Sequence, residues 1–282
     1  MGLLGGSGTK LGGRVRYEGH DMLGADAEQY RELWGTEMAM VFQDPMTSLN
    51  PVMKIGRQIT EGLRINLGMD KQTATETAIS LLRAVRIPAP ERRINEYPGQ
   101  LSGGMRQRVV IAVALACGPK LLFADEPTTA LDVTVQAQIL DLLADQQKER
   151  FMGMILVTHD LGVVAGRADE IAVMYGGRIV ERAPTKQLFA NMQMPYTEAL
   201  FNSIPKLSDP SHTRLDAIAG APPDLVNPPS GCAFAPRCAH AMPKCHSETP
   251  ELEEVPNSPG HFAACFYPKR SRIDFPSESN EI

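Results

Sequence analysis

Two acidic residues at the end of an apolar segment, Asp125 and Glu126, are the strongest candidates for chemistry in this chain. They follow residues 121–124, an apolar run that predicts a buried strand. A carboxylate at a strand end can hold Mg²⁺ through water, and its neighbour can orient or deprotonate an attacking water molecule. Such an acid can also do no more than cap the next helix. The run from Pro127 to Asp132 favours the catalytic interpretation.

A run of small residues, Ser102–Gly104, stands at the start of a predicted helix that continues from Met105 to Ala116. Serine is a good N-cap, and glycine lets backbone N–H groups come close to a phosphate. An isolated Ser-Gly-Gly would indicate an ordinary capped helix. Its position between Leu101 and Gln107 favours an anion site instead. Together with the acidic strand, it predicts a protein that binds a nucleoside triphosphate and cleaves its terminal phosphate bond.

Two further polar residues follow apolar segments elsewhere in the chain: Gln43 comes after Phe42, and His159 comes after Val157-Thr158. A histidine there can hydrogen-bond a γ-phosphate, and a glutamine can contact the metal ion and the water. Each signal is weak by itself, because a polar residue at a strand end is often satisfied locally. The spacing of His159 after the acidic segment supports a catalytic role.

Segments with strand character alternate with segments of helical periodicity. The strands are predicted at 38–42, 121–124 and 152–157. This alternation predicts an α/β fold with a parallel sheet, in which ligands bind at the carboxyl ends of the strands. Gln43, Asp125 and His159 follow those three strands, so we expect them to meet at one edge of the sheet.

The composition excludes several classes of protein. The chain has 282 residues, of which 43% are hydrophobic, enough for one large or two modest domains. Its 28 basic and 33 acidic residues give a net charge of −5, which argues against nucleic acid as a ligand. The longest apolar run, Val109–Cys117, is too short for a membrane span, and the first residues do not resemble a signal peptide. We therefore expect a cytoplasmic, soluble polypeptide that can still dock on a membrane protein.

The character of the sequence changes near residue 205. Upstream, residues 171–180 predict a hairpin with Gly176-Gly177 at its turn. Downstream, residues 206–282 hold twelve of the 22 prolines and four of the five cysteines, with little periodicity. We therefore divide the chain into a domain at 1–205 and a loop-rich extension at 206–282.

The extension carries a cysteine cluster with the spacing C-x5-C-x6-C-x19-C, formed by Cys232, Cys238, Cys245 and Cys265. Common zinc ribbons have C-x2-C pairs, which this spacing does not match. Four thiolates in a loop-rich segment can hold an iron–sulfur cluster or Zn²⁺, or they can remain metal-free thiols. Cys117 stands apart and is expected to pack in a helix. The histidines of the segment could substitute for a cysteine as metal ligands but are expected at the surface; they are His240, His246 and His261.

Together these segments resemble the motifs of an ABC-transporter nucleotide-binding subunit. Leu101–Gln107 is similar to the signature motif, with Met105 where many families have glutamine. Leu121–Glu126 is similar to Walker B, with Glu126 in the position of the catalytic base. The remaining matches are Ala130–Asp132 with the D-loop, Gln43 with the Q-loop and His159 with the switch histidine.

Longer strings narrow the resemblance to the dipeptide/oligopeptide (and nickel) importer family. They are Phe42–Pro51, Gly103–Arg108, Asp125–Gln138, and Pro195–Thr197 followed by the cysteine cluster. The resemblance covers nearly the whole chain, and its motifs are highly specific.

The resemblance implies an α/β fold: an ABC-type P-loop NTPase core with a helical signature subdomain at about 52–108 and a cysteine-rich extension. It implies ATP and Mg²⁺ as ligands and favours a [4Fe–4S] cluster on the four cysteines. Glu126, His159 and Gln43 would be catalytic, and Asp125 would hold Mg²⁺ through water. The residues expected to bind the nucleotide and its metal are Asp125, Gln43, Ser102, Gly103, Gly104, Gln107 and Asp132.

The resemblance also implies partners and a location. Members of the family energise peptide import together with a second ABC ATPase subunit, in a homo- or heterodimer. Two membrane permeases and an extracytoplasmic substrate-binding protein complete such a transporter. We therefore expect a peripheral protein on the cytoplasmic face of the membrane, with no nucleic-acid partner.

The first residues depart from the family pattern. Family members have a Walker A loop, G-x-x-x-x-G-K-[ST], which cradles the phosphates. Here Met1–Leu4 resembles the end of the helix that should follow that loop, and Gly5–Lys10 imitates the loop only in composition. The sequence therefore predicts an N-terminally truncated cassette. Its 282-residue form is expected to be inactive alone, although its signature segment could still complete a site in a partner.

Other functions fit the motifs less well. A non-hydrolysing subunit could lend its signature segment to a competent partner, but the intact Glu126 and His159 argue against it. The same type of subunit also serves nickel and glutathione importers, and the sequence leaves the cargo open. A DNA-maintenance ATPase of the ABC fold would carry long coiled coils, and no heptad run occurs here.

Overall fold

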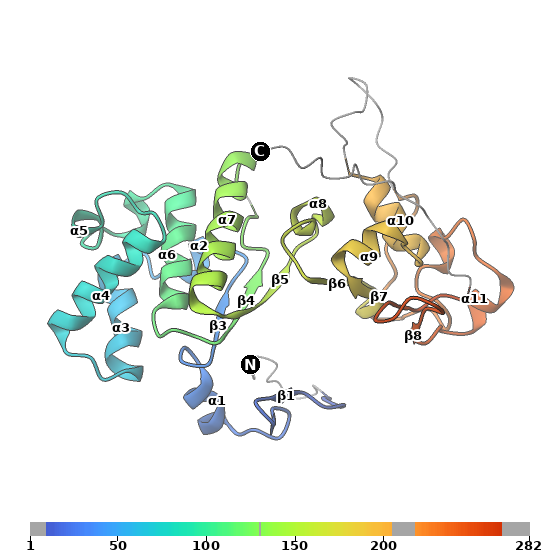
Figure 1. Cartoon of the computed structure of the whole chain (residues 1–282), viewed down its shortest axis with the longest axis horizontal. Coiled ribbons are helices and arrows are strands. Elements are labelled where there is room, and N and C mark those ends of the chain that lie inside the picture. Colours follow the sequence, from blue (N-terminus) through green and yellow to red (C-terminus); the bar gives the residue numbers. More distant parts are fainter. Residues whose placement is uncertain (1–9, 130, 205–217, 267–282) are drawn as a thin grey trace. The chain divides into compact units, whose positions relative to one another are not determined.

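The computed structural model describes residues 10–129, 131–204 and 218–266 (Figure 1). The chain forms two compact units, Met1–His159 and Asp160–Ile282. This division falls earlier than the boundary after residue 205 that the change in composition suggested. Residues 205–217, where that boundary would lie, are outside the described residues, as are the first nine residues, which were compared with the phosphate loop.

A parallel three-stranded sheet forms the centre of the first unit. Its strands are β3 (Met38–Val41), β4 (Leu121–Asp125) and β5 (Gly153–Val157), in the order β3-β4-β5. Both pairings are parallel, so each connection must cross over, and helices make these crossovers. The predicted α/β architecture is therefore confirmed.

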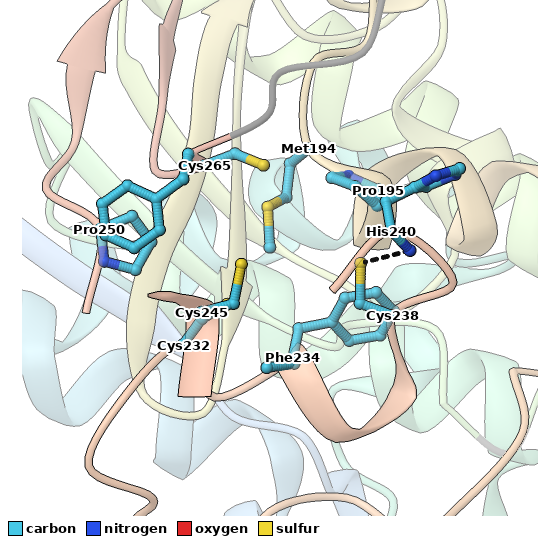
Figure 2. Close-up of a pocket in the computed structure, with 11 residues that line it drawn as sticks. Met194, Pro195, Cys232, Phe234, Cys238, His240, Cys245, Pro250 and Cys265 are labelled. Atoms are coloured by element: carbon cyan, nitrogen blue, oxygen red, sulfur yellow. Dashed lines mark hydrogen bonds between the residues drawn. The ribbon is translucent and has the colours of Figure 1, made fainter. Parts of the chain in front are cut away.

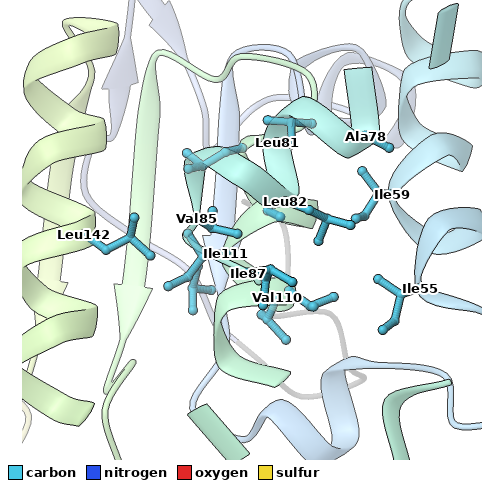
Figure 3. Packing of buried hydrophobic residues seen from close by; sticks show 14 of the residues in the cluster. Ile55, Ile59, Ala78, Leu81, Leu82, Val85, Ile87, Val110, Ile111 and Leu142 are labelled. Carbon is cyan, nitrogen blue, oxygen red and sulfur yellow. The ribbon is translucent and has the colours of Figure 1, made fainter. Parts of the chain in front are cut away.

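Helices pack against this sheet because their apolar residues recur at helical spacing. In α3 (Ile55–Asn66) the fully buried Ile55, Ile59 and Leu63 lie four residues apart and face the core. The other long helices of the unit are α4 (Lys71–Ala84), α6 (Gly103–Leu115) and α7 (Val133–Arg150). Figure 3 shows how α3, α4, α6 and α7 bring their buried side chains into one core.

Short elements complete the first unit. The predicted strand and turn at 14–19 becomes a small hairpin, and α1, which the sequence did not predict, follows it. These elements are β1 (Arg16–Tyr17), β2 (His20–Asp21), α1 (Ala27–Leu33), α2 (Pro45–Ser48), α5 (Pro90–Arg93) and the 3₁₀ turn η1 (Pro98–Gln100).

The second unit is built on an antiparallel sheet with the order β6-β7-β9-β8. The predicted hairpin is present as β6 (Glu170–Tyr175) and β7 (Arg178–Pro184). Its two turn glycines have φ values of 56° and 78°, a left-handed backbone that a two-residue hairpin turn needs. The cysteine-rich segment adds β8 (Glu253–Glu254) and β9 (Phe262–Ala263) to this sheet. A two-residue strand is too short to show alternation, which is why the sequence did not reveal it.

Four short helices and a 3₁₀ turn accompany that sheet. They are α8 (Leu161–Val164), α9 (Thr185–Ala190), α10 (Pro195–Asn202), η2 (Ala235–Arg237) and α11 (Pro243–Ser247). Throughout the described part of the chain, every helix is too short or too polar to cross a bilayer.

The core of the first unit gives a test of this packing. Ile59→Ala removes a side chain that is fully buried between helices, so the free energy of unfolding should fall by about 2–5 kcal/mol. Ile65→Ala in the same helix is the matched control, because Ile65 is 74% exposed, and it should change stability by less than about 0.5 kcal/mol. Urea unfolding of both variants measures the difference, and equal effects would contradict the assignment of the buried face.

Candidate active site

The carboxylate of Glu126 is the point at which the predicted catalytic residues meet. Gln43 donates from Nε2 to Oε2 of Glu126 over 2.8 Å. The ring nitrogen Nδ1 of His159 lies 3.1 Å from the other oxygen, Oε1. A third partner, the hydroxyl of Thr129, donates to Oε2 over 2.7 Å. Gln43 and His159 lie 83 and 33 positions from Glu126 in the sequence, and both contact its carboxylate.

The register of the parallel sheet produces this convergence. Val41 of β3 is level with Ala124 of β4, and Asp125 is level with Val157 of β5. The three strands therefore end within one residue of each other, and the residues that follow them emerge at the same edge. The backbone N–H of Glu126 extends the ladder by one bond, donating to the carbonyl of Val157 over 2.9 Å.

Glu126 has an unusual backbone conformation. Its φ of 43° lies in the left-handed region, which non-glycine residues rarely adopt and which costs on the order of 1–3 kcal/mol. Hydrogen bonds on both sides hold it there: its N–H binds the carbonyl of Val157, and its own carbonyl accepts the N–H of Thr129 at 3.1 Å. Strain of this kind persists where the surroundings impose it, and such sites are often functional.

The surroundings of Glu126 keep its side chain ionised. The Thr129 hydroxyl, the His159 ring and the Gln43 amide lower the pKa of the Glu126 carboxyl, and partial burial opposes them only in part. The carboxylate is 23% exposed, whereas the His159 side chain is 77% exposed and open to a ligand. An anionic acceptor next to an accessible imidazole can orient a water molecule and accept its proton.

Asp125 is placed differently from its neighbour. It is the last residue of β4, is half-buried, and has no side-chain hydrogen bond or ion pair to any other residue that the structure describes. Its oxygens are therefore available to water or a cation at the edge of the sheet where Glu126 lies. This fits the hard oxygen donors that Mg²⁺ requires.

The helix start predicted to bind anions is also present. Ser102 caps α6 and accepts the N–H of Met105, although the distance of 3.4 Å is long. A Cβ atom on Gly104 would lie 2.8 Å from a methyl carbon of Val135 in α7, so a glycine is needed for this close approach. Asp132 caps α7 and accepts the N–H of Val135 at 2.9 Å. Two capped helix N-termini, those of α6 and α7, therefore pack side by side.

Gln107, predicted to contact nucleotide, lies in a different environment. Its side chain is only 1% exposed, and its amide nitrogen has no partner among the described residues. A direct contact between this amide and a nucleotide outside the chain is therefore not available in this arrangement. Ser102, Gly103 and Gly104 are more exposed and remain the candidates for such a contact.

The four clustered cysteines lie together in the second unit. Cys232, Cys238, Cys245 and Cys265 line one pocket with Met194, Pro195, Phe234, Ala235, His240, Pro250 and Phe266. Figure 2 shows the sulfurs of Cys238, Cys245 and Cys265 facing a common space, into which the Met194 side chain also extends. His240, expected at the surface, lines the pocket, and burial raises the pKa of the Cys232 thiol.

Backbone groups already support the sulfurs. The N–H groups of His240 and Met242 donate to the sulfurs of Cys238 and Cys245, each over 3.4 Å. Gly231 is required beside them, because a Cβ atom there would come within 2.3 Å of the carbonyl oxygen of Cys245. Within residues 10–129, 131–204 and 218–266, no three His, Cys, Asp or Glu side chains are grouped closely enough to hold a metal ion. The cysteines share a cavity without meeting at one point.

Comparison with known proteins agrees with this geometry. The family described as "ABC transporter" matches residues 2–129, and "Oligopeptide/dipeptide transporter, C-terminal region" matches residues 180–245. A probable peptide ABC transporter ATP-binding protein of Sinorhizobium fredii is 50% identical over 256 residues, covering 91% of this chain and 76% of that protein. The oligopeptide transport ATP-binding protein OppD of Salmonella typhimurium is 47% identical over 268 residues, covering 95% and 78%. The chain belongs to the ABC transporter ATP-binding proteins of the oligopeptide family.

A solved ABC cassette has the same fold. The dimeric post-hydrolysis state of the ATP-binding cassette MJ0796, bound to ADP and phosphate, is 27% identical with a TM-score of 0.56. The match covers 62% of this chain and 74% of that chain. The chain is thus an ABC ATPase with the cassette fold of its family.

Thr129 is the site residue that the sequence did not single out. It lies within the run from Pro127 to Asp132, three residues after Glu126, and its N–H and hydroxyl both bind that residue. A hydroxyl three residues after an acid at a strand end is a recognisable turn signal. The signal was present, but the motif gave no reason to prefer this threonine to Thr128.

We predict that Thr129→Val weakens the pH-dependent stabilisation of the fold by Glu126. Because the folded-state pKa of Glu126 is lowered, its contribution is full above the unfolded-state value of about 4.3 and is lost as pH falls through the folded-state pKa. Without the hydroxyl donor the pKa is lowered less. The variant should therefore be less stable than wild type at neutral pH, and the difference should shrink in acid.

Urea unfolding between neutral and acidic pH measures this effect. Thr129→Ser keeps the hydroxyl and should retain most of the wild-type pH dependence. A stability difference between Thr129→Val and wild type that is independent of pH would show that the hydroxyl does not act through Glu126.

Proposed function

We propose that this protein is the ATP-hydrolysing subunit of an ABC importer of peptides. The observation that carries the proposal is the meeting of Gln43 and His159 on the carboxylate of Glu126. These residues follow the aligned ends of three parallel strands, where the cassette fold places its ligand. The relatives named for peptide and oligopeptide transport support peptides as the cargo.

The site would act on ATP through acid–base and electrostatic steps. Glu126 accepts a proton from the attacking water, whose oxygen bonds to the γ-phosphorus as the bond to the β-phosphate oxygen breaks. His159 contacts the γ-phosphate, and Gln43 contacts the water. Asp125 would hold Mg²⁺ through water, and the ion would supply charge neutralisation for the phosphate oxygens.

The finer organisation is also part of this proposal. The region from about 52 to 108, which contains α3, α4, α5 and the start of α6, would be the helical signature subdomain. Residues 1–205 would belong to the cassette, and residues 206–282 would be the extension typical of oligopeptide importers. The exposed N-terminus of α6 would face the nucleotide of a second ATPase subunit, with Ser102, Gly103 and Gly104 as contacts, while Asp132 caps the neighbouring helix.

Partners and location follow from the family. A second ABC ATPase subunit, two permeases and a substrate-binding protein would complete the importer. The chain would then act at the cytoplasmic face of the membrane, held there by the permeases.

Two substitutions in the assembled transporter test the proposal. Glu126→Gln preserves size but removes the base, so ATP turnover should fall by about 10²–10⁴-fold while ATP binding persists. Ser102→Arg should also lower turnover, because it removes the cap and blocks the α6 N-terminus. Loss of activity in Ser102→Arg but not in Glu126→Gln would identify a non-hydrolysing subunit that only lends its signature segment.

We further propose that the cysteine pocket holds a [4Fe–4S] cluster with a structural role. Each thiolate of a four-iron cluster binds a different iron, so the sulfurs need only surround a common cavity, as they do here. The two N–H groups aimed at the sulfurs of Cys238 and Cys245 suit a thiolate site.

Chemical analysis of anaerobically purified protein tests the cluster. We expect about four irons and about four acid-labile sulfides per chain. Cys245→Ser should lose them, whereas Cys117→Ser, which changes the cysteine outside the pocket, should keep them. One zinc per chain without iron would show that the pocket is a Zn²⁺ site and not a cluster site. The absence of both metals would show that the four cysteines are metal-free thiols.

A further inference from the structure

A fully buried ionisable pair lies in the second unit. Glu181 of β7 and His261 both have side chains that are 0% exposed, and Oε1 of Glu181 lies 2.7 Å from Nε2 of His261. This corrects the expectation that His261 lies at the surface. Burying such groups costs free energy unless each is well hydrogen-bonded, so a pair of this kind needs a reason.

Glu181 satisfies that requirement by binding two separate backbone N–H groups. Its Oε1 also accepts the N–H of Gln193 over 2.7 Å, and its Oε2 accepts the N–H of Met194 over 3.1 Å. Backbone N–H groups only donate, so both oxygens of Glu181 accept in these two bonds, and Oε1 is shared between the N–H of Gln193 and Nε2 of His261. One carboxylate therefore holds three segments: its own strand, the turn before α10, and the turn that leads into β9.

Two of these segments lead into walls of the cysteine pocket. Met194, in the turn before α10, and Pro195, the first residue of α10, line it on one side. Cys265 lines it from the segment after β9, and Ala263 of β9 pairs with Glu181 itself. The pair therefore holds the backbone of Met194, which lines the pocket, and the strand β9, which ends two residues before Cys265.

We propose that Glu181 and His261 are positioning residues of the four-cysteine pocket. They fix the Met194 wall and the Cys265 segment relative to the segments that carry Cys232, Cys238 and Cys245. Partners that orient ligands in this way commonly change metal affinity by about 10–100-fold. The inference rests on the proposed metal site for the identity of the occupant, but the positioning of the thiols can be measured without it.

The test compares Glu181→Gln with Glu170→Gln in the full chain. In Glu181→Gln an amide NH₂ replaces one acceptor and faces backbone N–H donors, which should release the turn at 193–194. Glu170→Gln is the matched control, because it removes the exposed Glu170–Arg182 ion pair on neighbouring strands of the same sheet. The probes are Zn²⁺, added to metal-free protein in a competition titration, and a thiol-alkylating reagent followed by peptide mass spectrometry.

For Glu181→Gln we expect Zn²⁺ affinity to fall by about 10–100-fold. Alkylation of Cys232, Cys238, Cys245 and Cys265 should become faster, while Cys117 in the first unit, the internal reference, keeps its rate. Amide exchange along the β6–β7 pairing should stay slow, and Glu170→Gln should match wild type throughout. His261→Asn should reproduce the effect, and the double variant should add little to either single change.

Two results would overturn the inference. Wild-type Zn²⁺ affinity and alkylation rates in Glu181→Gln would show that the pair does not position the pocket. Loss of β6–β7 protection together with faster alkylation would show that the pair merely supports the fold. If the wild-type chain binds no metal, the proposed metal site fails, while the alkylation comparison still decides whether the pair positions the thiols.

Discussion

The aligned ends of β3, β4 and β5, which stop within one residue of each other, are the constraint on which the proposed activity depends. Parallel pairing with this register brings the residues after three strands to one edge, and the backbone bond from Glu126 to Val157 extends the register beyond β4. A shift of one residue would turn each following side chain to the other face of the sheet. The shared carboxylate of Glu126 is a consequence of this alignment, and Glu126 has its left-handed backbone at this point of the chain.

A second layer of packing positions the proposed signature segment. The buried guanidinium of Arg108 in α6 donates to the carbonyl of Val85 over 3.1 Å and to the side chain of Gln138 in α7 over 3.0 Å. Together with the close approach of Gly104 to Val135, this connects α6 to the end of α4 and to α7. The N-termini of α6 and α7 are therefore held by the same core that supports the sheet. Desolvation lowers the pKa of Arg108, but the two acceptors compensate for its burial.

The sequence predicts the parts of the fold whose signals are local and repeated. The apolar strands 38–42, 121–124 and 152–157 and the Gly176-Gly177 turn all have such signals, and the structure contains each of them. Contacts that depend on tertiary structure could not be predicted. Nothing in the spacing of Gln107 distinguishes a buried amide from an exposed one, and nothing in the sequence pairs Glu181 with His261, 80 residues later. The two-residue strands likewise depend on tertiary contacts, since β9 pairs with β7 and β8 pairs with β9.

The most direct test of the account is the pKa of the Glu126 carboxyl, measured by ¹³C NMR titration of the wild-type chain with Glu126→Gln used to assign the signal. If Gln43, Thr129 and His159 donate to this carboxylate, its pKa lies below the ordinary glutamate value of about 4.3. A pKa at or above that value would mean that the three strand ends do not meet on Glu126. The proposed catalytic site would then be wrong.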